Sequence, residues 1–194
     1  AKVTKVRDYS EEEYQDETGE YFGNSDVIAP NLANSDEELI DKMKNAPMEY
    51  FDSEKLQDMN NTDVEDILNA SEDGGSEAMV KLGKQKAKEY KKNWDRLEKG
   101  IEDLDKEDSK GVPPPMALRD KKGDLHLLAG NTRMMSFTAA GKKLPLKVID
   151  YDGEFDYDAW DVKVKKDEEE AKKAKMNEAP RVPRKKGQHR GSKS

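Results

Sequence analysis

Four consecutive residues in this sequence are best suited to chemistry, and they directly follow an apolar stretch at residues 125–129: Gly130, Asn131, Thr132 and Arg133. A glycine turn between a strand and a helix presents free backbone amides and the positive end of the helix dipole, which suits phosphate. The guanidinium of Arg133 can hold two oxygens at once and stabilise charge on a transferred group. The spacing leaves a plainer alternative open, in which Gly130 only turns the chain, Thr132 caps the helix and Arg133 is a surface residue.

His126 lies in the stretch that leads into this turn, where strand alternation places it opposite Leu125 and Leu127. It could be a general base, a phosphate ligand or an ordinary strand residue. The sequence has no cysteine and only two histidines, which excludes thiolate zinc sites, thiol nucleophiles and a histidine-rich metal site. A Mg²⁺ ion held by carboxylates and nucleotide phosphates stays open, with these candidate ligands: Glu49, Asp52, Asp120 and Asp124.

Charge is unevenly distributed along a chain whose net charge is -8. Residues 1–80 hold 22 acidic and 6 basic side chains, whereas residues 116–151 hold 7 basic and 3 acidic ones. An anion site is therefore expected in the later stretch. The acidic loop after residue 149 could bind a cation, but its spacing is not that of a calcium-binding loop, and we interpret it as solvated: Asp150, Asp152, Glu154, Asp156 and Asp158.

The last 14 residues are basic, contain no acid and have no core-forming residues. This composition is typical of a sequence-independent nucleic-acid arm whose binding weakens with salt, or of a tail that only aids solubility. The residues that would contact DNA phosphates are Arg181, Arg184, Lys185, Lys186, Arg190 and Lys193.

A chain of 194 residues with 33% hydrophobic and 40% charged residues can form one modest domain with polar tails. No apolar run approaches membrane length, and the first residues lack a secretory signal, so we expect a soluble, cytoplasmic protein without a membrane partner. Its parts are an acidic, extended leader (1–34), a compact domain (35–162), a charged helix (163–180) and a basic disordered tail (181–194).

Local motifs predict the elements of the compact domain. Capping boxes begin at Ser35 and Thr62, the first opening a helix over residues 36–45, and residues 48–51 predict a strand. Residues 116–119 and 125–129 predict a hairpin with Gly123 at positive φ. Residues 132–140 predict a helix ended by Gly141, and residues 144–151 a further strand.

A break at residues 74–76 precedes apolar residues at helical spacing, from Val80 through Trp94 to Leu104. This stripe predicts one long helix near residues 76–104. The helix could form a coiled-coil seam in a homodimer, or it could lie against the domain core.

Residues 112–151, from the prolines through the glycine turn to the last strand, resemble the ParB/sulfiredoxin-like superfamily. The similarity is greatest to the stand-alone ParB-like nuclease-domain proteins common in phages. It rests on a proline-led strand, a glycine turn, a strand ending in a small residue, then Gly130, two polar residues, Arg133 and a short helix. Residues 48–56 look like the opening strand and turn of that family.

The resemblance implies an α/β (α+β) domain with a small mixed sheet, flanking helices and a turn that binds nucleotide phosphates. Family members include nucleotide-hydrolysing partition proteins, ATP-dependent sulfiredoxins, free-serine kinases and claimed nucleases. Sulfiredoxin chemistry is excluded because that branch of the family needs a cysteine in the glycine–arginine motif, and this sequence has no cysteine. Partition proteins usually carry a second arginine where Thr132 stands, and no helix-turn-helix module follows.

Two functional classes remain open from the sequence. In the first, Gly130–Arg133 binds an NTP (ATP or CTP), with or without Mg²⁺, for NTP hydrolysis, phosphoryl transfer or nuclease activity on or near DNA. In the second, a DNA-associated or virion interaction protein keeps the fold without catalysis.

Overall fold

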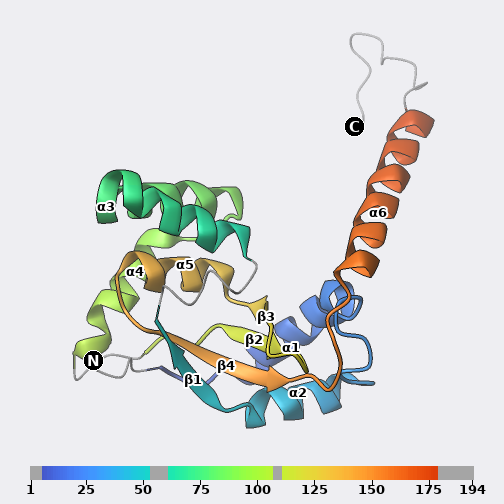
Figure 1. The fold of residues 1–194 in the computed structure, drawn as a ribbon, viewed down its shortest axis with the longest axis horizontal. Coiled ribbons are helices and arrows are strands. Elements are labelled where there is room, and N and C mark those ends of the chain that lie inside the picture. The colour runs from blue at the N-terminus through green and yellow to red at the C-terminus, as the bar shows by residue number, and fades with distance from the viewer. Residues whose placement is uncertain (1–5, 53–60, 107–110, 179–194) are drawn as a thin grey trace, which may run out of the picture. The chain divides into compact units, whose positions relative to one another are not determined.

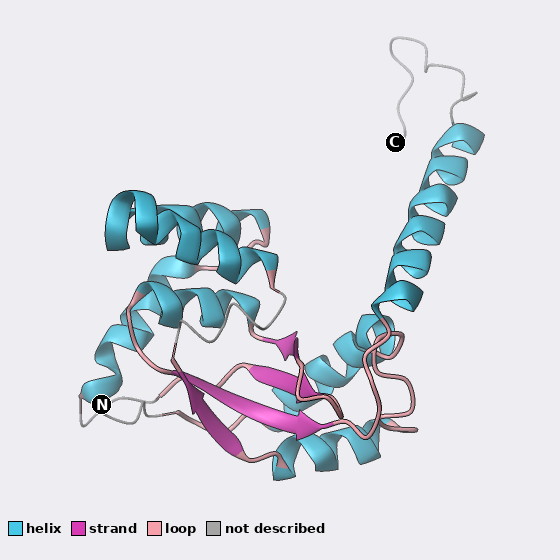
Figure 2. Cartoon of the chain, viewed as in Figure 1, coloured by secondary structure: helices cyan, strands magenta, loops and turns pink. Residues whose placement is uncertain are grey.

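The computed structural model describes residues 6–52, 61–106 and 111–178. The chain divides into two compact units, residues 1–155 and residues 156–194. The first unit is a mixed α/β structure with helices around a four-stranded sheet, as Figures 1 and 2 show. The predicted α/β class and small mixed sheet are therefore confirmed. None of the helices in the described ranges combines the length and apolar character that a bilayer crossing requires.

The sheet has the order β1-β4-β2-β3. Its strands are β1 (Met48–Phe51), β2 (Met116–Arg119), β3 (Leu125–Ala129) and β4 (Leu144–Asp150). β2 and β4 run parallel, whereas the other neighbours are antiparallel. A parallel pair needs a crossover, and here β3 and helix α5 (Asn131–Ala139) bring the chain back. This crossover places the glycine turn at the end of the edge strand β3.

The predicted hairpin between β2 and β3 forms with its glycine at positive φ. Gly123 has φ 91°, a conformation that residues other than glycine rarely adopt. The Asp120 carboxylate accepts hydrogen bonds from the backbone N–H groups of Lys122 (3.0 Å) and Asp124 (2.9 Å). Asp120 thereby stabilises the turn.

Two helix starts were predicted from capping motifs. α2 spans Asp36–Asn45 as predicted, and the Ser35 hydroxyl accepts a hydrogen bond from the amide of Glu38. The second cap is displaced by one residue, because Asn61 and not Thr62 caps α3. The Asn61 side chain accepts from a backbone N–H in the first turn at 3.0 Å, and asparagine is among the strongest N-caps.

Helices α3 (Thr62–Glu89), α4 (Trp94–Glu102) and α5 cover one face of the sheet (Figure 1). Their core includes Trp94, Met134 and Phe137, which are fully or almost fully buried together with sheet residues. α5 is mostly buried along its length because it lies under α3 and α4. The first turn of α5 is therefore held on a rigid base.

The predicted break at residues 74–76 is confirmed, but the predicted single long helix near residues 76–104 is wrong, because α3 ends at Glu89 and α4 begins at Trp94. α3 breaks at Gly75 (φ 67°, ψ -156°). Its second half folds back along the first. Two ion pairs show this reversal, since Lys86 Nζ lies 2.8 Å from Asp63 Oδ1 and 2.9 Å from Asp66 Oδ2. A straight helix would hold these residues about 30 Å apart. The chain reverses again at Lys91 (φ 57°) before α4 begins.

The apolar stripe is therefore shared between two helices. Ala87 of α3 and Trp94 and Ile101 of α4 are buried in the same core. The Trp94 ring lies on Gly83, where any Cβ would overlap the indole. The stripe lies against the domain core, which was one of the two alternatives, and the continuous seam that a coiled-coil homodimer would need does not form.

The leader is folded over its described residues and is not extended as predicted. Ser10 opens α1 (Glu11–Glu20) with a capping box that Glu13 completes, and the π-helical turn η1 (Tyr21–Ser25) follows. Its tyrosines are at most 5% exposed and pack with α2 on the second face of the sheet: Tyr9, Tyr14 and Tyr21. The leader is thus one layer of the domain.

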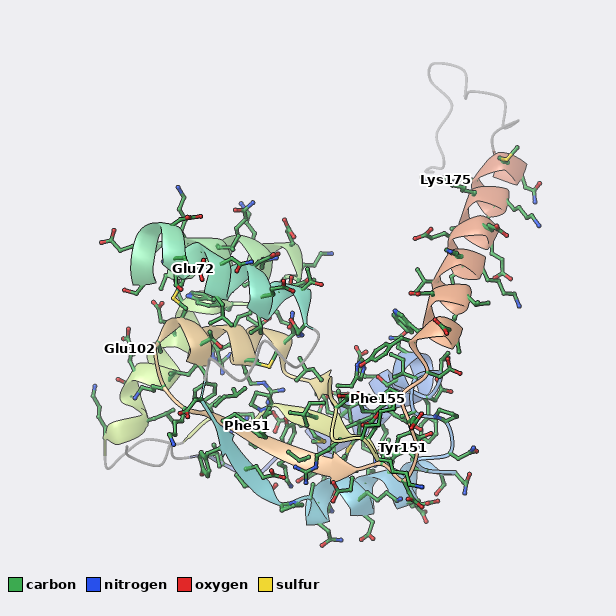
Figure 3. The ribbon with its side chains drawn as sticks, viewed as in Figure 1. Phe51, Glu72, Glu102, Tyr151, Phe155 and Lys175 are labelled. Carbon is green, nitrogen blue, oxygen red and sulfur yellow. The ribbon has the colours of Figure 1, made fainter. Side chains whose placement is uncertain are left out.

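Polar contacts fasten this layer to the sheet. Lys147 of β4 is buried, and its Nζ donates to the Tyr14 hydroxyl at 3.0 Å. The Tyr151 hydroxyl, just after β4, donates to the carbonyl of Pro30 at 2.8 Å. Figure 3 shows Tyr151 beside Phe155, and their rings are stacked with centroids 6.0 Å apart.

The second unit contains α6, which spans Tyr157–Glu178 and so begins before the predicted residue 163. Asp156 caps it by accepting from the backbone N–H of Ala159 at 2.9 Å. Charged side chains such as Lys175 extend from it (Figure 3). The predicted disordered tail, residues 181–194, lies outside the described residues.

Candidate phosphate-binding site

The glycine turn connects β3 to α5 as predicted. Gly130 is the N-cap of α5 in a left-handed conformation (φ 91°, ψ 34°), and among the described residues no side chain caps the helix. The first amides of α5 therefore have no side-chain acceptor. A Cβ at Gly130 would lie 2.9 Å from both Pro115 Cα and Arg133 Nη2, so only glycine fits. Thr132 is buried and does not cap the helix, contrary to the plainer alternative.

One guanidinium nitrogen of Arg133 is already hydrogen-bonded within the protein. Its Nη1 donates to the Tyr9 hydroxyl at 3.0 Å and to the carbonyls of Pro113 and Pro114 at 2.9 and 3.4 Å. The guanidinium also lies over the Tyr9 ring, 5.3 Å from its centroid. All its hydrogen bonds with described residues run through Nη1, which leaves Nη2 and Nε for an anion. Arg133 is thus neither a plain surface residue nor a fully free one.

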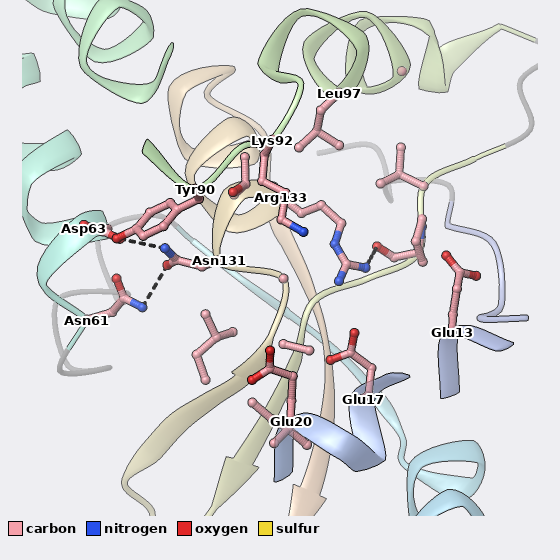
Figure 4. Close-up of a pocket in the computed structure, with 18 of the residues that line it drawn as sticks. Glu13, Glu17, Glu20, Asn61, Asp63, Tyr90, Lys92, Leu97, Asn131 and Arg133 are labelled. Atoms are coloured by element: carbon pink, nitrogen blue, oxygen red, sulfur yellow. Dashed lines mark hydrogen bonds between the residues drawn. The ribbon is translucent and has the colours of Figure 1, made fainter. Parts of the chain in front are cut away.

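The Asn131 side chain is held by α3 and its cap. Its Nδ2 donates to Asp63 at 2.7 Å, and Asn61 donates to its Oδ1 at 3.1 Å (Figure 4). Burial raises the pKa of Asp63, but hydrogen bonds from Lys86, Tyr90 and Asn131 outweigh burial, and the net pKa is lowered. Asn131 thus positions the turn through its side chain and offers a ligand its backbone amide.

A cavity of about 1360 Å³ opens beside the turn. Its walls come from β3, the glycine turn, α1, the segment before β2 and the turn between α3 and α4, as Figure 4 shows in part. All four predicted turn residues line it. The structure therefore places the predicted phosphate turn in the wall of a space large enough for a nucleotide.

Most of the charged residues of this cavity were not expected from the sequence. Besides Arg133, three basic residues line it: Arg7, Lys92 and Arg96. Four acidic residues also line it: Glu13, Glu17, Glu20 and Asp63. Three of these acids come from α1, which was expected to be part of an extended leader. The capping box at Ser10 was the one signal that could have located them.

The acidic wall is not uniform. Glu13 is bound by Arg7 through two hydrogen bonds of 2.8 and 3.0 Å, and these lower the pKa of Glu13 to about 2. Glu17 has no such partner in the described ranges. Burial raises the pKa of Glu17, although the nearby Arg133 and Lys92 act in the opposite direction.

His126 lines the cavity from β3. Burial lowers its pKa to about 4, and its ring lies against Phe155 with centroids 5.7 Å apart. It is therefore neutral near pH 7, and its low basicity makes it a weak general base.

The predicted Mg²⁺ ligands do not reach the cavity. Glu49 and Asp52 form ion pairs with Arg119 (2.9 Å) and Lys143 (3.7 Å). None of the four candidates lines the cavity: Glu49, Asp52, Asp120 and Asp124. Within the described ranges no group of three acidic or histidine side chains is placed to hold a metal ion.

The acidic loop after β4 also serves the fold. Asp150 pairs with Arg119 at 3.1 Å, and Glu154 with Lys122 at 3.8 Å. Asp156 caps α6 through its side chain. These contacts fit the interpretation of a solvated acidic loop better than a cation site.

The six predicted DNA-binding residues between Arg181 and Lys193 lie outside the described residues. The resemblance to the ParB/sulfiredoxin-like superfamily rests on the residues quoted for it. Comparisons with protein-family models, curated proteins and solved structures find no match to this chain.

Proposed function

We propose that this chain is a ParB-like protein that binds the phosphates of a nucleotide, ATP or CTP, in the cavity at the start of α5. The observation that carries the proposal is the uncapped first turn of α5, which opens onto the cavity beside Gly130 and Arg133. Free amides at a helix N-terminus bind anions well. Arg133 Nη2 and Nε would add charge-assisted hydrogen bonds.

Lys92, in the turn between α3 and α4, and Arg96 of α4 line the same cavity and support the same proposal. Both are exposed, and their side chains make no hydrogen bond or ion pair with the described residues. Cations without a structural partner that face an anion-binding turn would extend the site along a polyphosphate chain.

The described residues include no group of three side chains suited to hold a metal ion for this ligand. A Mg²⁺ ion would have to arrive with the nucleotide and take most of its ligands from phosphates and water. When bound, the Mg²⁺ ion would neutralise negative charge on the phosphates.

Binding is better supported than catalysis. Arg133 has committed one nitrogen to Tyr9 and Pro113, and His126 is a weak base. These observations favour nucleotide binding without catalysis, and they leave the second candidate, a non-catalytic DNA-associated or virion interaction protein that keeps the fold, as the alternative. Action on or near DNA, through the basic residues between Arg181 and Lys193, remains part of the proposal on their composition.

Calorimetric titration with ATP, CTP and GTP, with and without Mg²⁺, tests the proposal. Lys92→Gln and Arg96→Gln are expected to weaken binding about 2- to 5-fold each, the effect of removing one exposed charge. Lys88→Gln, an exposed lysine of α3 outside the cavity, is the matched control and should bind as the unmodified protein does. No saturable binding of any nucleotide would refute the proposal.

Arg133→Gln should remove binding altogether, but it also removes the hydrogen bonds to Tyr9 and Pro113. Its result counts only if thermal denaturation shows a folded protein. If Arg133→Gln is not folded, the Lys92 and Arg96 variants still decide whether the proposal holds.

A further inference from the structure

Glu17 occupies the wall of the cavity that faces Arg133. It lies on α1 three residues after the buried Tyr14, so that one face of this helix packs on the sheet and the next lines the cavity. Figure 4 shows the Glu17 carboxylate directed toward the Arg133 guanidinium across open space. No hydrogen bond or ion pair joins Glu17 to another described residue, so the two charges face each other without closing the gap.

The charged and titratable groups around Glu17 come from four segments of the chain: α5, the α3–α4 turn, α1 itself and the residues before α1. Arg133 of α5 and Lys92 of the α3–α4 turn favour its ionised form, whereas Asp16 and Glu20 of its own helix oppose it. From the leader, the Tyr9 hydroxyl lies near enough to interact with it.

His126 of β3 also lines the cavity but stays neutral above pH 5, because its pKa is about 4. Arg7 and Glu13 neutralise each other in their ion pair. Glu17 is therefore the half-buried carboxyl of this cavity that lacks a bonded cation among the described residues.

An anion bound by the first turn of α5 and by Arg133 would enter the gap in front of Glu17. Two negative groups in one partly desolvated site disfavour each other's ionised form. The bound anion also screens Glu17 from Arg133, which is one of the two cations that favour its charged state. Both effects increase the proton affinity of Glu17 when the site is filled.

We propose that Glu17 gates this site by coupling anion binding to the uptake of one proton on its carboxylate. The inference rests on the proposed function, since it concerns the same phosphate site. Phosphate groups then bind more tightly as the pH falls, and at neutral pH Glu17 acts as a built-in competitor for Arg133. Glu17 is a residue that sets affinity, with no part in any bond-breaking step.

The test is calorimetric titration of ATP into the full chain at pH 5.5 and pH 7.5, in buffers of different ionisation enthalpy. Glu17→Gln removes the charge at constant size. Glu12→Gln is the matched control, because Glu12 is an exposed residue of the same helix that does not line the cavity. Comparing variants at each pH cancels the titration of ATP itself.

We expect Glu17→Gln to bind ATP about tenfold more tightly than the unmodified protein at pH 7.5, the effect of a shift of about one pKa unit in a coupled group. The gain should shrink at pH 5.5, and proton uptake should fall by up to one proton per ATP. Glu12→Gln should match the unmodified protein at both pH values.

Equal pH dependence and equal proton uptake in Glu17→Gln and the unmodified protein would overturn the inference while leaving the phosphate site in place. An equal gain in Glu12→Gln would overturn it as well, since general electrostatics would then suffice. Absence of ATP binding in all three proteins at both pH values would instead refute the proposed function, and the inference with it.

Discussion

Gly130→Ala, compared with Gly123→Ala, separates two reasons for a glycine at the start of α5. One is the left-handed backbone conformation, and the other is the close approach of neighbouring atoms. Gly130 and Gly123 share the same φ of 91°, but an added Cβ at Gly123 would meet no atom within 4 Å. At Gly130 it would lie 2.9 Å from Pro115 Cα. Gly123→Ala therefore measures the backbone cost alone, whereas Gly130→Ala adds the cost of moving the chain apart.

The left-handed conformation costs alanine about 1–2 kcal/mol relative to glycine. Overpacking that forces backbone shifts costs about 1–3 kcal/mol more. The free energy of unfolding, measured by urea denaturation, should therefore fall by about 1–2 kcal/mol in Gly123→Ala and about 2–5 kcal/mol in Gly130→Ala.

The two variants should also differ in anion binding. An alanine methyl at position 130 would come within 2.9 Å of Arg133 Nη2. It would displace the guanidinium and so should weaken ATP binding by roughly tenfold or more, or about 1.4 kcal/mol. Gly123→Ala should bind ATP normally. Equal losses of stability in the two variants, or normal ATP binding by Gly130→Ala, would refute the close-approach argument.

Three further predictions concern the leader and the tail. Tyr14→Ala should lower the free energy of unfolding by about 3–5 kcal/mol, because Tyr14 is 1% exposed; an unchanged value would mean that the leader is not a layer of the domain. Glu13→Gln should lower Tm at pH 7, because the folded pKa of Glu13 is lowered to about 2 from 4.5 and its stabilisation exists above pH 4.5. The difference should disappear as the pH falls from 4.5 toward 2, and a difference that persists at pH 2 would contradict this assignment. Deleting residues 181–194 should remove the salt-dependent part of DNA affinity; unchanged DNA affinity at low salt would exclude the tail as a DNA-binding arm.

Elements with strong local signals could be predicted from the sequence. α2 spans Asp36–Asn45 as expected, because Ser35 caps its start and Pro47 follows its end. The β2–β3 hairpin and the turn at Gly130 have the positive φ angles that glycine allows. In each case the determining interactions lie within a few residues of one another.

The leader escaped prediction for a physical reason. α1 has only two buried residues, Tyr14 and Thr18, and its other positions are mainly acidic or polar. Such a helix shows little amphipathic periodicity, and its stability comes from packing against distant sheet residues.

The glycines at residues 74–75 signalled the first helix reversal, but the second left no clear trace in the apolar pattern. Ala87, Trp94 and Ile101 keep helical spacing although the chain turns between them. The second turn uses Lys91 at φ 57°, a residue type that gives no turn signal. Likewise, Arg7 and Arg96 reach the cavity from distant segments, and only the tertiary fold brings them into the same cavity as Arg133.

The most direct test of the phosphate site is a titration of ATP followed by the backbone amide resonances of ¹⁵N-labelled protein. The proposed site predicts saturable shifts that are largest at Asn131, Thr132 and Arg133, whose amides form the uncapped first turn of α5. Exposed residues outside the cavity, such as Lys88, should shift little. No shift in the first turn of α5, or changes confined to surface lysines, would contradict the central claim.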